Sequence, residues 1–359
     1  MFLFYLLGGL AVVGGGGVVF LNQPQFGKLP AGERLARIEQ SPNYRDGEFQ
    51  NLEPTEMFTS EKSRTRVMWE FMTQRSDGVK PDQPVPAVKT DLKSLPRDSD
   101  LIVWFGHSSY LLQLAGKRIL VDPVFVNCAP VGFMNKPFKG TDLFKPDDMP
   151  DIDILIITHD HYDHLDYKTV KALKGRVGKV VCGLGIGAHM ERWGYTPEQL
   201  MEMDWMDDAD LGESIAVHCL PARHYSGRSL RRNKTLWASY LVETPSANVF
   251  IGGDSGYGKH FRMIGERFAR IDWAILENGQ YGKDWEQIHT IPEKLGEEMK
   301  DLHARNAITV HNSKFALARH RWDEPLEIVD SLQRDTTIHA HIARPIIGEV
   351  LPLNVNNEN

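Results

Sequence analysis

Short apolar runs rich in β-branched and aromatic residues recur from residue 101 almost to the end of the chain. Their length and composition predict buried or half-buried strands. The runs are LIVWFG, YLLQL, RILVD, DILIITH, KVVCG, IAVHCL, ASYLVE, NVFIGGD, WAILE and AITVH. Helical stretches separate some of them, as over 167–174 and 292–305, whereas others follow one another after a short turn. The pattern favours a mixed domain of sheets and helices over a purely doubly wound sheet.

The chain begins with a different pattern. Residues 1–27 contain no charged side chain, and residues 2–21 are almost wholly apolar. About 20 residues of helix rise about 30 Å, enough to cross the hydrocarbon core of a bilayer. A cleaved signal peptide is the alternative, but no basic residue precedes the run and no A-x-A site follows it. We expect a single-pass transmembrane anchor over 1–21. The first cations behind it, Lys28 and Arg34, predict that the rest of the chain lies on the cytoplasmic side of the membrane.

Residues 22–97 have the character of an accessory region. Short helices are predicted over 33–40 and 61–75, and the second carries an apolar stripe formed by Val67, Met68, Phe71 and Met72. The stripe favours a helix that packs on the main domain, with a membrane-facing helix as the alternative. Prolines then recur from 79 to 100, as is typical of an extended connector. The main domain is therefore expected over 98–359.

Composition excludes several classes of protein. Of the 359 residues, 42% are apolar and 25% are charged, which indicates a folded globular protein. The net charge of −7 gives a nucleic-acid partner no electrostatic support. The three cysteines, Cys128, Cys182 and Cys219, are an odd number without CxxC spacing. They predict neither a disulfide framework nor a cysteine zinc cluster, and mildly favour a reducing compartment.

The strongest chemical signal is the hexapeptide HDHYDH at residues 159–164, which directly follows the apolar run 152–157. Its ligand-type side chains therefore lie at the end of a predicted strand. Imidazole and carboxylate groups are typical ligands of Zn²⁺, Fe and Mn²⁺. His159, His161, Asp163 and His164 are too many for one ion that keeps an open position, so we expect two ions that share this loop.

Further ligand-type residues follow other predicted strands. His224, Asp254 and His311 each come just after a β-rich run. Ligands at the ends of several strands are held by a rigid scaffold. Together with the loop, they would suit two ions that share a carboxylate.

This order of residues resembles the metallo-β-lactamase-fold hydrolases over about residues 101–352. The resemblance implies an α+β fold, an αββα sandwich in which two mixed β-sheets are flanked by helices. It also implies the division of the ligands: one ion bound by His159, His161 and His224, the other by Asp163, His164 and His311, with Asp254 bridging them. The two divalent ions are expected to be Zn²⁺, with Fe or Mn as alternatives.

Other stretches are similar to the branch that contains the phospholipase D enzymes hydrolysing N-acyl phosphatidylethanolamine. They are WFGHSS, VDPVF, GDSGY, and HYS leading to NKTLW. In that branch a histidine corresponding to His289 lines the substrate side. The stretch LENGQY at 276–281 departs from the more apolar Pro-Ile-Gly-Ala-Tyr type of the phospholipase. The resemblance implies a phosphodiesterase that cuts the bond between phosphate and head group.

Two metal ions can hold a hydroxide that attacks phosphorus at neutral pH. We expect Asp163 and Asp254 to hold this hydroxide in line, and His289 to contact the phosphate or to aid the leaving alkoxide. His107, Tyr257 and Arg231 are the expected substrate contacts. No GxSxG motif occurs, so no covalent acyl-enzyme is expected.

Several side chains near these residues have two interpretations each. His107 could instead orient the metal loop by hydrogen bonds, and Asp122 is expected to orient a ligand rather than to be one. Glu277 could serve in proton transfer or be a structural acid. The basic cluster at 228–234, which includes Arg231, could attract phosphate or an anionic membrane surface, or it could be a solvated loop.

Alternative functions follow from the same residues. A lactonase or a soluble phosphodiesterase could use the same centre, and a membrane-anchored protein could bind metal or lipid without turnover. The complete set of ligand-type residues, with an aspartate suited to bridging, favours an enzyme. The predicted anchor favours a phospholipid substrate, because a tethered domain meets amphiphiles at high local concentration.

Overall fold

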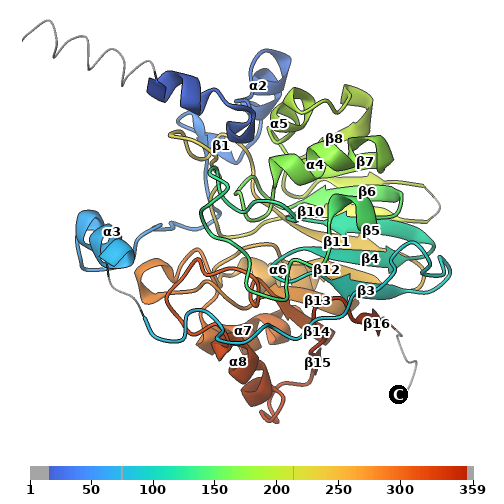
Figure 1. Cartoon of the computed structure of the whole chain (residues 1–359). Coiled ribbons are helices and arrows are strands. Elements are labelled where there is room, and N and C mark those ends of the chain that lie inside the picture. Colours follow the sequence, from blue (N-terminus) through green and yellow to red (C-terminus); the bar gives the residue numbers. More distant parts are fainter. Residues whose placement is uncertain (1–15, 74–75, 213, 354–359) are drawn as a thin grey trace, which may run out of the picture.

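The structure, a computed structural model, describes residues 16–73, 76–212 and 214–353 (Figure 1). Two mixed β-sheets of seven strands each form the centre of the molecule. In the first sheet the strand order is β16 (Val350–Pro352), β3 (Leu101–Trp104), β4 (Tyr110–Leu114), β5 (Lys117–Val121), β6 (Ile152–Ile157), β7 (Val177–Gly183) and β8 (Leu200–Met203). In the second it is β15 (His341–Ala343), β14 (Ala304–Val310), β13 (Ile271–Glu277), β12 (Asn248–Ile251), β11 (Ser239–Glu243), β10 (Ala216–Leu220) and β9 (Asp208–Asp210).

Each sheet is antiparallel at one end and parallel at the other. In the first sheet β16, β3, β4 and β5 pair antiparallel, whereas β5 to β8 run parallel. In the second sheet β9 to β12 pair antiparallel and β12 to β15 run parallel. Because parallel strands end at the same edge of a sheet, the loops that follow β5, β6, β12, β13 and β14 can bring their side chains together.

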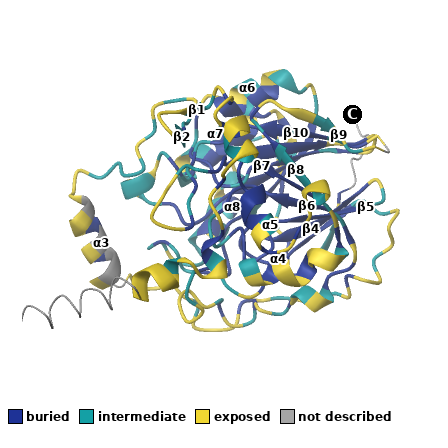
Figure 2. Ribbon diagram, turned by 90° about the horizontal axis from the view of Figure 1, so that it is seen from above, coloured by how far each residue is buried: buried dark blue, intermediate teal, exposed yellow. Residues whose placement is uncertain are grey.

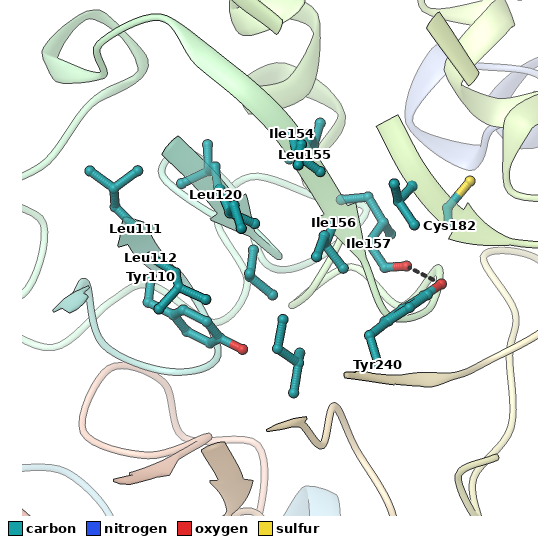
Figure 3. Packing of buried hydrophobic residues seen from close by; sticks show 14 of the residues in the cluster. Tyr110, Leu111, Leu112, Leu120, Ile154, Leu155, Ile156, Ile157, Cys182 and Tyr240 are labelled. Carbon is teal, nitrogen blue, oxygen red and sulfur yellow. Dashed lines mark hydrogen bonds between the residues drawn. The ribbon is translucent and has the colours of Figure 1, made fainter. Parts of the chain in front are cut away.

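The main hydrophobic core fills the space between the two sheets and continues over the outer face of the first sheet. Along β11 the side chains alternate: Tyr240 and Val242 join this core, whereas Leu241 joins the layer on the other face of the second sheet. Figure 3 shows Tyr240 beside Ile156 and Ile157 of β6, with the Tyr240 hydroxyl donating to the Ile157 carbonyl at 3.4 Å. A strand with apolar residues on both faces is one that is covered on both sides, which is why these runs lack polar alternation.

Helices cover the outer faces of both sheets, and their yellow, exposed sides face outward in Figure 2. On the second sheet, Phe261, Leu295 and Val329 of three successive helices fill the second core. On the first, Val170 and Met190 join the main core. The helices are α2 (Glu33–Ile38), α3 (Arg64–Thr73), α4 (Tyr167–Leu173), α5 (Gly187–Arg192), α6 (His260–Arg267), α7 (Pro292–Asp301) and α8 (Glu324–Leu332). Short 3₁₀ turns are η1 (Pro24–Phe26), η2 (Pro146–Asp148), η3 (Lys174–Arg176), η4 (Pro197–Gln199) and η5 (Lys283–Trp285).

The sandwich of two mixed sheets with outer helices confirms the fold expected for the main domain. Every apolar run singled out in the sequence forms a strand. The helix predicted over 292–305 is too long, because α7 ends at Asp301 and the chain already enters β14 at Ala304. The four short strands at the edges of the sheets, β8, β9, β15 and β16, were not expected. β9 has the sequence DAD, without an apolar pattern, and β16 contains Pro352, which only an edge strand tolerates.

The accessory region packs on the sandwich. Both helices expected there form, as α2 and α3, and between them the hairpin β1 (Tyr44–Arg45) and β2 (Glu48–Phe49) was not predicted. Ile38 and Phe49 are fully buried in the main core. Val67 of α3 is also buried, and the other three side chains of its predicted stripe lie outside the described residues. Figures 1 and 2 place α3 at the edge of the molecule.

The predicted transmembrane anchor falls mainly on residues 1–15, which lie outside the described part of the chain. Residues 16–21 are helical and largely exposed. Among the described residues, no helix has both the length and the apolar character needed to cross a bilayer.

Candidate metal centre

The side chains of the candidate centre come from the ends of strands in both sheets. Asp122 follows β5 and residues 159–164 follow β6 in the first sheet. In the second sheet, His224, Asp254 and His311 follow β10, β12 and β14, and Glu277 is the last residue of β13. The centre therefore lies where the two sheets meet, on a scaffold of hydrogen-bonded strands.

Three histidines form a first cluster. The atoms His159 Nε2 and His161 Nδ1 are 2.9 Å apart, and His161 Nδ1 and His224 Nε2 are 3.2 Å apart. Their ligand atoms all lie within 4.8 Å of one another, a spacing at which one ion can contact all three. This is the set that the resemblance assigned to the first ion.

A second cluster surrounds Asp163. Its Oδ2 atom lies 2.9 Å from His107 Nε2, 3.4 Å from His311 Nε2 and 3.7 Å from His164 Nε2. The structure thus brings together the three residues assigned to the second ion and adds His107 to them. His107 is fully buried and its Nε2 contacts Asp163, which favours its interpretation as a residue that orients the metal loop.

Asp254 lies between the two clusters. One carboxylate oxygen is 3.1 Å from His164 Nε2, and the other is 3.3 Å from His311 Nε2 and 3.8 Å from both His159 Nε2 and His224 Nε2. A single carboxylate therefore contacts members of both sets, as a bridging ligand must. The His and Asp clusters are consistent with two divalent ions.

Burial also fits cations at this centre, and in the first cluster the protonation of the histidines does so as well. His164 Nε2 and Asp254 Oδ1, which face each other inside the centre, are buried atoms without a hydrogen-bond partner among the described residues. Burial lowers the pKa of His161 to about 4 and holds the pKa of His159 and His224 well below the usual range. These rings are neutral at pH 7 and keep the lone pairs that bind a metal. Burial opposes ionisation of Asp254, but the surrounding histidines, His164 first, hold its pKa well below the usual range.

A second layer of hydrogen bonds orients these ligands. Asp122 Oδ2 lies 2.8 Å from His164 Nδ1, and Asp122 also accepts from the Thr158 hydroxyl at 2.6 Å. The Nδ1 atom of His224 lies 2.7 Å from the Ile288 carbonyl. Such contacts fix the ring and leave Nε2 for the ion. The role expected for Asp122, orienting a ligand, is the one that the geometry gives it.

Three residues around the centre have left-handed backbone conformations. They are His107 (φ 54°) and His311 (φ 69°) of the second cluster, and Asp122 (φ 41°), which orients His164. Non-glycine residues rarely adopt positive φ, because Cβ approaches the backbone. Backbone strain of this kind concentrates at functional sites, where the surrounding structure holds it in place. These three residues follow or end strands around the centre, although positive φ also occurs elsewhere in the fold, as at Asp46 and Met206.

The clusters open into a cleft of about 490 Å³. His161, Asp163, Asp254, His289 and His311 line it. Its walls are mostly apolar, and they include side chains of the accessory region. The apolar wall residues are Met57, Phe58, Val67, Ala129, Pro130, Met134, Trp285, Ile288 and Leu317. The cleft thus offers an apolar surface directly beside the metal clusters.

The predicted substrate contacts have different locations. His289 lines the cleft, where its Nδ1 lies 2.5 Å from Glu277 Oε1. Arg232 also lines the cleft, whereas its exposed neighbour Arg231 does not. Tyr257 is turned away from the cleft, because its hydroxyl donates to Asp301 at 2.8 Å and its ring stacks on Phe261. The expectation that Arg231 and Tyr257 contact substrate therefore finds no support in their positions.

Sequence reasoning missed the support that the N-terminal region gives to the centre. Asn51 donates to the His224 carbonyl at 2.8 Å and accepts from the His224 backbone N–H at 3.1 Å. The Gln25 carbonyl accepts from the buried Arg228 guanidinium at 2.8 Å, and the same guanidinium donates to the Asp160 carbonyl in the metal loop. No periodicity marks Asn51 or Gln25, so no signal in the sequence identified them.

Asp160 was also missed as a support, although it lies inside the hexapeptide. Its carboxylate accepts from the Gly227 N–H at 2.7 Å and the Thr235 hydroxyl at 2.9 Å, and lies 3.2 Å from His189 Nε2. His189 Nδ1 in turn accepts from the Lys28 backbone N–H at 2.9 Å. A chain of hydrogen bonds therefore joins the N-terminal segment to the metal loop.

Comparisons with known proteins agree with this geometry. A family model described as a beta-lactamase superfamily domain matches residues 117–312. An uncharacterized protein of Mycobacterium tuberculosis is 37% identical over 317 residues, which cover 87% of this chain and 84% of the relative. The N-acyl-phosphatidylethanolamine-hydrolyzing phospholipase D 1 of Caenorhabditis elegans is 29% identical over 258 residues, 65% of this chain and 71% of the relative. Among solved structures, a metallo hydrolase of Ignicoccus hospitalis superposes with a TM-score of 0.53 at 21% identity, covering 70% of this chain and 97% of that one, and shows the shared fold.

Proposed function

Since the chain belongs to the beta-lactamase superfamily and is a metal-dependent hydrolase of that fold, we propose that it is a phospholipase D-type phosphodiesterase. Its substrate is N-acyl phosphatidylethanolamine or a related phospholipid. The observation that carries the proposal is the apolar cleft beside the two histidine clusters. The name of the C. elegans relative supports the same substrate class.

The chemistry follows from the side chains of the two clusters beside the cleft. His159, His161 and His224 would hold one ion, and Asp163, His164 and His311 the other, with Asp254 between them. Two divalent ions held by these residues, which we propose to be Zn²⁺, would supply an activated water and would neutralise charge that grows on the phosphate oxygens.

The remaining side chains act on the substrate. His289 lines the cleft beside Asp254, with its Nδ1 3.9 Å from Asp254 Oδ2, and faces the bond that breaks. Arg232 at the cleft wall attracts the phosphate, because a guanidinium donates to two oxygens at once. The apolar walls receive acyl chains and exclude water from the reacting atoms.

The rim of the cleft supports a membrane partner. Phe133 and Leu230 are 77% and 83% exposed, and each belongs to a loop that contributes a side chain, Met134 or Arg232, to the cleft. Exposed aromatic and aliphatic side chains around a cleft mark interaction surfaces, and a bilayer is the source of an amphiphilic substrate. We propose that an N-terminal anchor over 1–21 holds the enzyme at the membrane with this domain on the cytoplasmic side.

The test uses the full chain in detergent, with metal content measured and a panel of four substrates: N-acyl phosphatidylethanolamine, phosphatidylcholine, bis-p-nitrophenyl phosphate and an acyl lactone. We expect about two ions per chain and release of an N-acylethanolamine that stops when a chelator is added. If only the lactone or the soluble diester is hydrolysed, the protein is a lactonase or a soluble phosphodiesterase, and the phospholipid assignment is wrong. For the anchor, removal of residues 1–21 should release the protein from membranes, and persistence there would contradict it.

A further inference from the structure

Glu277 occupies a distinctive place in the centre. It is the last residue of β13, and it pairs in register with Val310 of β14, directly before His311. Its side chain is only 3% exposed. One carboxylate oxygen accepts from the Ser255 backbone N–H at 2.7 Å, which fixes the orientation of the whole group.

The other oxygen of Glu277 contacts two imidazole rings. Oε1 lies 2.5 Å from His289 Nδ1 and 3.4 Å from His311 Nδ1. The two rings are nearly parallel, with an interplanar angle of 13° and centroids 5.5 Å apart. In both rings Nδ1 faces Glu277. The opposite nitrogen of His311, Nε2, faces Asp254 and Asp163 at the metal centre.

The consequence for His289 follows from its surroundings. It lies in the irregular segment between β13 and α7, and no strand holds its ring. An imidazole can rotate about its χ2 angle and can carry its proton on either nitrogen. A carboxylate that accepts from Nδ1 removes both freedoms, because it fixes the tautomer and the plane of the ring. Nε2 is then the nitrogen left for the cleft that His289 lines.

We propose that Glu277 is a positioning residue that acts on substrate through His289: it holds the ring so that Nε2 faces the reacting atoms. The proposal rests on the proposed hydrolytic function of the cleft. It assigns Glu277 no bond to metal, although its carboxylate lies within 4.8 Å of ligand atoms of Asp254 and His311.

A double-mutant cycle tests this with the metal-loaded full chain: Glu277→Gln, His289→Ala and the two together. If Glu277 acts through His289, the first change lowers kcat about 10- to 100-fold with KM changed less. The double variant is then no slower than His289→Ala alone. Both ions stay bound in all variants. The matched control is Glu298→Gln, which changes another buried carboxyl group that hydrogen-bonds Thr290 rather than His289.

Two results would overturn the proposal. Losses that multiply in the double variant would show that Glu277 acts independently of His289. Loss of metal in Glu277→Gln would make it a metal ligand or a support of His311. The cycle is run with whichever ester of the panel the wild-type chain hydrolyses. It therefore tests the role of Glu277 even if the phospholipid assignment is wrong. A second readout needs no substrate: ¹⁵N signals of His289 should show a proton on Nδ1, and a proton on Nε2 would refute the geometry.

Discussion

Asp122 Oδ2 lies 2.8 Å from His164 Nδ1, so a carboxylate at the end of β5 orients a ring of the loop that follows β6. We expect Asp122→Asn to weaken metal binding about 10- to 100-fold, because a metal-ligating imidazole depends on the group bonded to its other nitrogen. Competition with a chelator measures this affinity. Asp153→Asn is the control, since Asp153 bonds Arg97 and the Arg118 backbone on the same pair of strands. Equal affinities would contradict the role of Asp122.

His161→Ala is expected to abolish hydrolysis while the fold persists. Among the described residues, the nitrogens of the His161 ring contact only His159 and His224, the other members of its cluster, so the fold loses little when the ring is removed. The first ion loses one of three ligands, and a metal contributes several kcal/mol to the transition state, about a thousandfold or more in rate. Turnover, metal content and circular dichroism are measured. His218→Ala serves as control, because His218 on β10 pairs with Asp208 outside the cleft. Full turnover of His161→Ala after metal depletion would overturn the proposed mechanism.

Arg231 and Arg232 form a matched pair for phosphate attraction. Arg232 lines the cleft and its guanidinium lies 5.4 Å from the Tyr225 ring centroid, whereas Arg231 is exposed outside the cleft. Arg232→Glu should lower kcat/KM for anionic diesters about tenfold or more and spare a neutral lactone. Arg231→Glu should have a small effect that disappears at high salt. Similar losses in both variants, or on both substrates, would contradict attraction at the cleft wall.

Gly27 and Gly32 test the contact between the N-terminal segment and the metal loop. Both have positive φ, 69° and 59°, but a Cβ on Gly27 would lie 2.1 Å from His189 Nδ1, whereas one on Gly32 would have open space. Gly32→Ala should lower the free energy of unfolding by about 1–2 kcal/mol through backbone strain alone. Gly27→Ala should cost more and should also weaken metal binding, because His189 contacts Asp160 of the loop. Denaturation by urea and metal titration measure both effects, and equal losses would refute the coupling.

Glu298 predicts a pH dependence of stability. Burial raises the pKa of this carboxyl group well above its ordinary value of 4.5. Between pH 4.5 and the folded pKa, the group is protonated in the folded chain and ionised in the unfolded chain, so its stabilising contribution is complete below pH 4.5 and falls as the pH rises towards the folded pKa. The slope is about 1.4 kcal/mol per pH unit. Glu298→Gln should remove this slope, and should be more stable than wild type at pH 8. Glu297→Gln, at an exposed neighbour, should leave the slope unchanged.

Much of this structure could be predicted from the sequence, because two of the signals in the sequence are local. A run such as that of β6 is apolar on both faces, which requires layers on both sides, and a ligand-type residue directly after such a run lies at a sheet edge. The seven ligand candidates followed from that rule together with the resemblance. The same rule applies to Asp122, which ends the run RILVD, and to His107, which follows the run LIVWFG.

The remaining features depend on contacts that no local pattern encodes. Asn51 and His224 are 173 residues apart, and a single asparagine in an irregular segment has no periodicity. Whether Arg231 or Arg232 lines the cleft depends on the course of their loop. This loop turns at Gly227 and Asn233, which both have positive φ. Tyr257 comes shortly after Asp254 in the sequence, but the direction of its side chain is set by a hydrogen bond to Asp301, which lies 44 residues further along the chain.

The division of the centre between the two sheets has a consequence for biosynthesis. His159 and His311 are separated by 152 positions (311 − 159), and β14, which places His311, pairs with β13 inside the second sheet. A nascent chain that has grown only to residue 300 can present the hexapeptide loop and His224, but not the complete pair of clusters. High-affinity capture of both ions must therefore wait until the second sheet closes. Cells starved of metal during synthesis should then still accumulate folded apoprotein that can be loaded afterwards.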